Sequence, residues 1–140
     1  MNLPVREISV TGPVDARLQA PPSKSVTQRA LVVASLAGGP SLLRAPLASA
    51  DTRTLLKALG DLGIRSRCTP EGWRIQGEGG RIPSPGAVLD AGDAGTAARF
   101  LTALVCLGHG RFVVDGSERM RQRPILPLVE ALAALGVRAR

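Results

Sequence analysis

The sequence predicts an α/β fold built from repeated units, and three observations support this prediction. Amphipathic segments with helical spacing alternate with short β-branched runs bounded by glycine and proline. One stretch, LLKALGDLGIRSR (55–67), recurs as LVEALAALGVRAR (128–140), 73 residues further along the chain. The chain has 140 residues, of which 44% are hydrophobic, so it can bury a core and is not disordered.

Four helical segments are expected, and a glycine follows the end of each. Leucines 55, 59 and 62 recur at i, i+4 and i+7, which defines one buried face. Proline favours the first turn of a helix, and glycine favours the position after its end. On these signals the helices run from about 26 to 37, from about 51 to 62, from near Thr96 to before Gly108, and from Pro124 to before Gly136.

Short strands are expected between the helices, at 41–45, 63–68, 73–76, 87–90 and 111–115. The TPEG sequence between two of them (69–72) predicts a hairpin turn. The predicted order is strand, helix, strand, helix, strand, strand, after which the series begins again. The second series stops at Arg140 without the hairpin that completes the first, so we expect the chain to be a fragment of a longer protein.

The composition limits the classes of function. Eighteen basic and eleven acidic residues give a net charge of +7, which suits either nucleic acid or small anionic metabolites. The sequence has no apolar run long enough for a signal peptide or for a membrane span, which predicts a cytoplasmic protein. Two distant cysteines and a single histidine do not predict a metal site.

The first candidate site is the segment PPSKSVTQRA (21–30), which leads into the first helix. Ser23 or Ser25 can cap the helix, Lys24 lies at its N-terminus, and Arg29 follows about one turn later. Free amide groups and the positive end of the helix dipole attract anions there, and two cations strengthen the attraction. The alternative is an ordinary capped helix with solvated basic residues.

The second candidate site is DAGDAGTAARFL (90–101), another loop leading into a helix. Gly95 allows a ligand to approach the backbone, Thr96 can cap the helix, and Arg99 repeats the role of Arg29. Because both loops occupy the same place in the repeat, we expect two anion sites that face one cleft.

A third stretch, GSERMRQRPI (116–125), carries alternating arginines before the fourth helix. Most of them are expected to be solvated. Arg123 directly precedes Pro124, which favours an extended conformation at the helix entrance, so Arg123 is the predicted ligand.

Taken in order, PPSKSVTQRALVVASLAGG, GDAGTAARFLTA and ERMRQRPILPLVEAL resemble successive signatures of the 5-enolpyruvylshikimate-3-phosphate (EPSP) synthase family. The resemblance implies a longer protein of two α/β domains, each made of βαβαββ units of the enolpyruvyl transferase type. Residues 1–20 would then pack with an absent second domain. Residues 21–140 would form a partial N-terminal domain, with one unit at about 21–80 and a truncated unit at about 84–140.

The resemblance also implies a reaction. The enolpyruvyl group of phosphoenolpyruvate would pass to the 5-hydroxyl of shikimate 3-phosphate, with release of phosphate, on the route to chorismate and the aromatic amino acids. Addition and elimination through a tetrahedral intermediate would need no metal and no organic cofactor. Both substrates are polyanions, so a basic cleft suits them. The whole enzyme would be a monomer without nucleic-acid or membrane partners, and this chain alone is expected to be inactive.

Individual roles follow from the same resemblance. Lys24 would contact both substrates and assist proton movement. Ser25 and Arg29 would hold shikimate 3-phosphate. Gly95 would present a backbone N–H group to phosphoenolpyruvate, and Arg123 would bind that substrate as a cation.

Four further positions lie within the matching motifs. Thr96 and Arg99 are assigned to shaping the loop. Asp93 replaces the usual asparagine and should weaken anion binding unless a nearby arginine pairs with it. Pro22 stands where glycine is common, which stiffens the loop.

Two other functions stay open at this point. The related enolpyruvyl transferase that acts on UDP-N-acetylglucosamine typically carries Lys-Asn in its first motif and a cysteine in its mobile loop. Here the motif is Lys-Ser and residues 108–123 hold no cysteine. A basic nucleic-acid-binding module also fits the charge, but Trp73, Phe100 and Phe112 are the only aromatic residues on which bases could stack.

Overall fold

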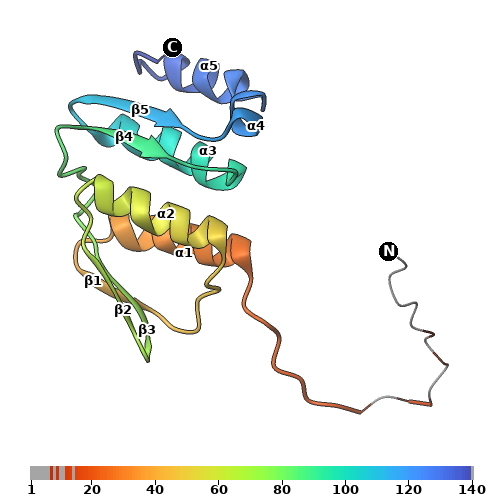
Figure 1. Cartoon of the computed structure of the whole chain (residues 1–140). Coiled ribbons are helices and arrows are strands. Elements are labelled where there is room, and N and C mark those ends of the chain that lie inside the picture. The colour runs from red at the N-terminus through yellow and green to blue at the C-terminus, as the bar shows by residue number, and fades with distance from the viewer. Residues whose placement is uncertain (1–6, 8, 10–11, 14, 140) are drawn as a thin grey trace.

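The structure is a computed structural model that describes residues 7, 9, 12–13 and 15–139. Three helices pack on one another at its centre, with one sheet against α1 and α2 and a second sheet against α2 and α3 (Figure 1). These helices are α1 (Lys24–Leu36), α2 (Ala50–Asp61) and α3 (Gly95–Leu104). The predicted α/β class is therefore confirmed.

The first sheet has three strands, β1 (Pro40–Leu43), β2 (Ser66–Thr69) and β3 (Gly72–Gln76), in the order β1-β3-β2. Both neighbouring pairs are antiparallel. Thr69 lies opposite Gly72, so the predicted hairpin turn is confirmed. Gly72 has φ +142°, and a Cβ at this position would collide with the carbonyl group of Leu43.

The second sheet is a parallel pair, β4 (Gly86–Asp90) and β5 (Arg111–Asp115). The crossover between them consists of α3 and the short 3-10 helix η1 (Val105–Leu107). After β5 come α4 (Glu118–Arg121) and α5 (Leu126–Ala134). No helix in the described part of the chain is long and apolar enough to cross a membrane.

The core is mainly aliphatic, and the aromatic side chain of Trp73 is buried in it as well. Leu55, Leu59 and Leu62, the predicted buried face of α2, are fully buried. Leu31 of α1 and Leu101 of α3 join them in one cluster. Each buried leucine contributes about 1.5–3 kcal/mol, so this cluster fixes the relative positions of the three helices.

The prediction that the fourth helix opens at Pro124 is wrong. The helix α5 begins at Leu126, and Pro127 takes the place in its first turn. The short helix α4 was not predicted, and its cause is local, because the Ser117 side chain accepts a hydrogen bond from the Met120 amide at 3.1 Å and caps it.

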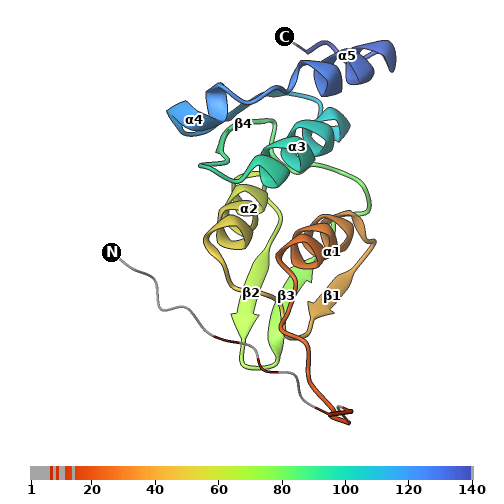
Figure 2. The ribbon, with the colours of Figure 1, turned by 90° about the vertical axis from the view of Figure 1, so that its right-hand side faces the viewer.

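The predicted order begins with a strand, but in the structure the first unit begins with the helix α1. Residues 15–23 before α1 form no strand and extend away from the body of the molecule (Figure 2), whereas the second unit does start with a strand, β4. The predicted packing of residues 1–20 falls partly outside the described residues, since 1–6, 8, 10–11 and 14 are not among them, and it stays a prediction. Arg140, the last residue of the predicted repeat, lies outside them too.

Candidate functional site

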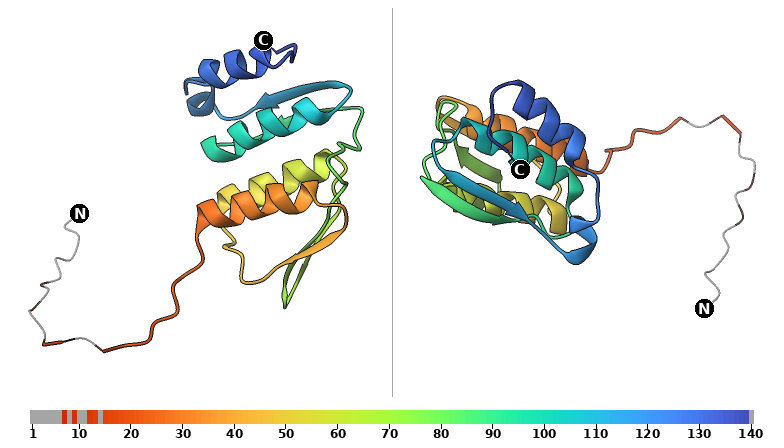
Figure 3. Two further views of the ribbon diagram at one scale, coloured as in Figure 1. Left: turned by 180° about the vertical axis from the view of Figure 1, so that it is seen from behind. Right: turned by 90° about the horizontal axis from the view of Figure 1, so that it is seen from above.

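The N-terminal ends of α1, α2 and α3 lie at the same end of the molecule (Figures 1 and 3). The positive ends of three helix dipoles therefore face the same region, which favours negatively charged ligands there. Lys24 is the first residue of α1 and Gly95 is the first residue of α3. The two loops that the sequence predicts as anion sites both lead into this end.

At the N-terminus of α1, Lys24 forms an ion pair that the sequence analysis missed. Its Nζ atom lies 2.7 Å from Oδ2 of Asp51, which is in the first turn of α2. The Ser23 side chain accepts a hydrogen bond from the Val26 amide at 3.4 Å, so of the two predicted caps Ser23 is the one used. Half of the Lys24 side chain is exposed, so the pair adds little stability but holds the ammonium group at the helix end.

The other predicted residues of α1, Ser25 and Arg29, lie on its exposed surface. Within the described residues, neither side chain makes a hydrogen bond or an ion pair. Both groups are therefore available to a ligand.

At the N-terminus of α3, the structure brings Gly95, Arg99 and Arg123 together. A Cβ atom placed on Gly95 would lie 2.5 Å from Nη1 of Arg123 and 3.4 Å from Nη1 of Arg99. The Arg123 guanidinium therefore lies directly against the backbone of Gly95. No side chain caps α3. The predicted donor, the Gly95 amide, already donates a hydrogen bond to the carbonyl oxygen of Asp93 at 3.0 Å, so in the first turn it is the Thr96 and Ala97 amides that stay available to an anion.

Arg99 links the segment that carries Arg123 to the first turn of α3 by two hydrogen bonds. Its Nη1 donates a hydrogen bond to the carbonyl oxygen of Gly95 at 3.1 Å, and its Nη2 donates one to the carbonyl oxygen of Pro124 at 2.8 Å. One guanidinium thus joins the loop that carries Arg123 to the first turn of α3. Arg29 makes no comparable bond in the described chain.

The prediction that Thr96 caps this helix is wrong. The N-cap residue is Ala94 and the helix starts at Gly95, so Thr96 is already the second helical residue. Its hydroxyl is then too far along the helix to accept from the free amides of the first turn.

Asp93 has a partner, but the partner is not an arginine. The Ser117 hydroxyl donates a hydrogen bond to Oδ1 of Asp93 at 2.6 Å, and the Ser117 amide donates one to the carbonyl oxygen of Gly92 at 3.1 Å. These bonds tie the loop before α3 to the turn before α4. The negative charge of Asp93 is not neutralised by an ion pair among the residues described.

A second carboxylate nearby, Asp115, is neutralised. Arg121 donates two hydrogen bonds to its two oxygens at 2.8 and 2.7 Å. These bonds lower the pKa of Asp115 to about 2. Because Arg121 is occupied in this way, Arg123 is the arginine of this stretch that lies against α3.

Two hollows border the region. A small one of about 110 Å³ lies between α3 and the segment 114–125, with Arg99, Arg121 and Arg123 in its wall. A larger one of about 520 Å³ lies between α1 and β1 and reaches Ser23. Neither is lined by both Lys24 and Arg123, so neither is the single cleft that the sequence predicts.

One buried polar residue of α1 has no partner. Gln28 is only 1% exposed, and both polar atoms of its amide lack a hydrogen bond in the described structure. A buried amide left in this way costs about 1–3 kcal/mol.

The architecture places the chain in a known structural class. The solved 2.37 Å structure of EPSP synthase from Acinetobacter baumannii is similar to it, with a TM-score of 0.75 and 24% sequence identity. The similarity covers 86% of this chain and 28% of that one, and it shows that the two share a fold.

The family follows from the sequence comparison. The family model of EPSP synthase (3-phosphoshikimate 1-carboxyvinyltransferase) matches residues 8–140, and the chain belongs to this family. The 3-phosphoshikimate 1-carboxyvinyltransferase of Methanosphaerula palustris is 48% identical over 128 residues, and that of Nostoc sp. is 49% identical over 127. Each match covers 89% of this chain, which spans about 30% of the length of these relatives.

Proposed function

We propose that this chain supplies part of the substrate site of an enolpyruvyl transferase. That enzyme forms a bond between the 5-hydroxyl oxygen of shikimate 3-phosphate and the central carbon of phosphoenolpyruvate, and it releases inorganic phosphate. The observation that carries the proposal is the contact of Arg123 with Gly95 at the uncapped N-terminus of α3, in a chain of the EPSP synthase family.

The phosphoenolpyruvate site combines two kinds of donor. The Thr96 and Ala97 amides in the first turn of α3 supply hydrogen bonds and the positive end of a dipole, and Arg123 adds a planar cation that binds phosphate or carboxylate. Arg99 fixes the position of Arg123 relative to α3 through its hydrogen bonds to the carbonyl oxygens of Gly95 and Pro124. Such preorganised donors stabilise charge that develops on a transferred group.

The shikimate 3-phosphate site lies on α1 in this proposal. Ser25 and Arg29 are exposed side chains near the helix N-terminus, and Lys24, the first residue of α1, pairs with Asp51 in the first turn of α2. Lys24 contacts both substrates and assists proton movement, and Asp51 positions its ammonium group. No metal or organic cofactor takes part.

The family assignment favours this function over the two alternatives. The relatives from Methanosphaerula palustris and Nostoc sp. are both named 3-phosphoshikimate 1-carboxyvinyltransferase, which favours that reaction over transfer to UDP-N-acetylglucosamine or nucleic-acid binding. In our proposal the enzyme works in the cytoplasm as a monomer, with small anionic substrates and without nucleic-acid or membrane partners. Residues 21–140 form part of one of its domains, as one unit and most of a second.

The experiment joins this chain to the remaining part of the Methanosphaerula palustris relative, in place of the matching 30% of that protein. This chimaera is expected to release phosphate from phosphoenolpyruvate only when shikimate 3-phosphate is present. The isolated 140-residue chain is expected to release none. A folded chimaera without activity, beside an active parent enzyme, would contradict the proposal.

A matched pair of variants in the chimaera tests the site itself. Lys24→Ala is expected to abolish phosphate release and to leave the fold intact, because Lys24 lies at an exposed helix end. Lys57→Ala is the control, since Lys57 is the only other lysine and also pairs with an aspartate, Asp61 at 2.8 Å. If Lys24→Ala released phosphate as fast as an active Lys57→Ala, Lys24 would have no role in the mechanism.

A further inference from the structure

The segment between β1 and α2 holds its backbone in an unusual conformation. Ala45 has φ +45°, and it is the only residue other than glycine with a positive φ in the described part of the chain. This left-handed conformation is unfavourable for alanine, because its Cβ approaches the neighbouring carbonyl oxygen. Such a residue persists only where the surrounding structure fixes it, so contacts nearby hold this segment in place.

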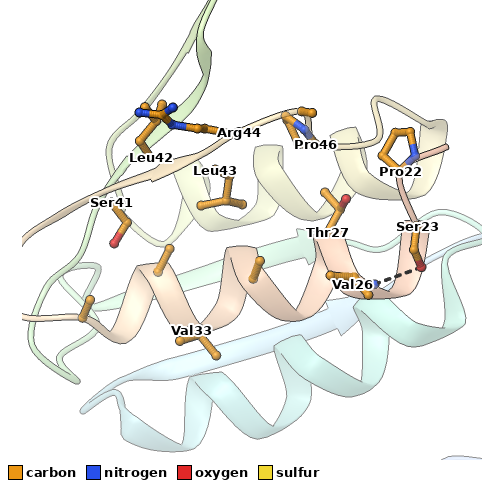
Figure 4. Close-up of a pocket in the computed structure, with 14 residues that line it drawn as sticks. Pro22, Ser23, Val26, Thr27, Val33, Ser41, Leu42, Leu43, Arg44 and Pro46 are labelled. Atoms are coloured by element: carbon orange, nitrogen blue, oxygen red, sulfur yellow. Dashed lines mark hydrogen bonds between the residues drawn. The ribbon is translucent and has the colours of Figure 1, made fainter. Parts of the chain in front are cut away.

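Two buried threonines make these contacts, both at Leu47. Thr27 of α1 accepts a hydrogen bond from the Leu47 amide at 3.0 Å. Thr52 of α2 donates a hydrogen bond to the Leu47 carbonyl oxygen at 2.7 Å. The Thr27 side chain points from α1 toward the segment that contains Pro46, the residue before Leu47 (Figure 4). We call these two hydrogen bonds the threonine bridge, because through Leu47 they join α1 to α2 near the N-termini of both helices.

The threonine bridge is fixed at its α2 end by a capping box. The Thr52 hydroxyl accepts a hydrogen bond from the Ser49 amide at 2.9 Å, and the Ser49 hydroxyl accepts one from the Thr52 amide at 3.3 Å. The Thr52 hydroxyl therefore both donates and accepts, which fixes its orientation. The start of α2 is thus held at the residue that directly follows Asp51.

The threonine bridge lies next to the ion pair of Lys24 with Asp51. Thr27 follows Lys24 by three residues on α1, and Thr52 follows Asp51 by one on α2. The two side chains of the ion pair are 51% and 30% exposed, so the pair is too weak to determine how the two helices sit. Thr27 and Thr52 are 5% and 0% exposed, and breaking a buried hydrogen bond leaves its partner unpaired. The buried bonds are therefore the stronger constraint.

We propose that Thr27 and Thr52 are positioning residues, which set the Lys24 ammonium group against the Asp51 carboxylate through Leu47. Neither threonine touches a substrate, and both act through the ion pair. The effect on catalysis rests on the proposed function. The effect on the ion pair does not, because it can be measured in the 140-residue chain without substrates.

Hydrogen exchange tests the threonine bridge in the unchanged chain. The Leu47 amide should exchange with solvent several-fold more slowly than the amide of Ala48, which has no hydrogen-bond acceptor in the described structure. Equal exchange rates of the two amides would overturn the proposal.

NMR of variants tests whether the threonine bridge positions the ion pair. Thr27→Val keeps the shape of the side chain but removes the acceptor for the Leu47 amide. The nuclear Overhauser contact between the Lys24 ε-methylene and the Asp51 β-methylene protons should weaken several-fold in Thr27→Val and return in Thr27→Ser. Thr102→Val is the control, since the Thr102 hydroxyl donates only within α3, to the Ala98 carbonyl oxygen at 2.8 Å. An undiminished contact in Thr27→Val, or an equal loss in Thr102→Val, would overturn the proposal.

A double-mutant cycle in the chimaera tests the consequence for catalysis. Thr27→Val should lower kcat several-fold, and Thr27→Ser should restore it. The double variant Thr27→Val, Asp51→Asn should match Asp51→Asn alone within about twofold, because both changes act through the same ion pair. Losses that multiply would show that Thr27 acts apart from the pair and would overturn the proposal. If the chimaera with the unchanged chain is inactive, the proposed function fails, whereas the NMR contact still decides the positioning of Lys24.

Discussion

The contact between Gly95 and Arg123 makes a sharp prediction for Gly95→Ala. The added Cβ would lie 2.5 Å from Nη1 of Arg123, about 1 Å closer than an ordinary van der Waals contact. The neighbour is the end of a long side chain, so the guanidinium retreats instead of the helix. The fold should therefore survive, because alanine is also up to about 1 kcal/mol better than glycine in a helix.

Although the fold should survive Gly95→Ala, the binding of phosphoenolpyruvate should weaken. A retreat of this size weakens a charge-assisted hydrogen bond worth about 1.5–3 kcal/mol, so the affinity for phosphoenolpyruvate should fall by about ten- to a hundredfold. The assay measures the KM for phosphoenolpyruvate in the chimaera, beside urea unfolding of the chain.

Gly60→Ala is the matched control, because Gly60 lies inside α2 and its added Cβ would have no neighbour within 4 Å. It should raise stability by about 0.5–1 kcal/mol and leave the KM unchanged. An unchanged KM in Gly95→Ala would show that the contact of Arg123 with Gly95 does not bind phosphoenolpyruvate. A loss of stability large enough to explain the lost affinity would also contradict this role.

The remaining predictions concern other polar contacts. Gln28→Leu should raise the free energy of unfolding by about 1–3 kcal/mol in urea, because it removes a buried amide without partners; a decrease would show that the amide is bonded. Asp51→Asn should change stability by less than about 1 kcal/mol, yet lower the kcat of the chimaera about tenfold, as Lys24 loses its partner. An unchanged kcat would remove Asp51 from the positioning of Lys24. The Asp115 carboxyl should titrate near pH 2 by NMR, and in Arg121→Ala its pKa should return toward 3.8. Since this pKa is lowered in the folded state, the Asp115 pair stabilises the fold above pH of about 4, and this contribution is lost as the pH falls through 2. A pKa that stays near 2 without Arg121 would contradict the assignment of its cause.

Much of the fold could be predicted because its signals are local and periodic. Leu55, Leu59 and Leu62 define a buried helical face by spacing alone, and the structure buries all three. Gly63, at φ +87°, ends that helix as its position in the sequence indicates. The start of α5 was mispredicted because two prolines, at 124 and 127, offer the same signal, and only tertiary packing decides between them.

The contacts of the candidate site were harder to predict, because they join residues far apart in the sequence. The pairing of Lys24 with Asp51 depends on how α1 packs against α2, which no motif specifies. The bond from Arg99 to Pro124 spans 25 residues in the same way. The motifs thus indicated which residues to consider, and the fold determined which of them meet.

The central claim is that the N-termini of α1 and α3 act together on small phosphorylated anions. The most direct measurement is an NMR titration of the isotope-labelled chain with phosphoenolpyruvate, following the backbone amides of residues 24–26 and 95–97. Both groups of amides are predicted to shift along one saturation curve with a single Kd. Shifts at only one helix end, or two curves with different Kd values, would contradict the claim.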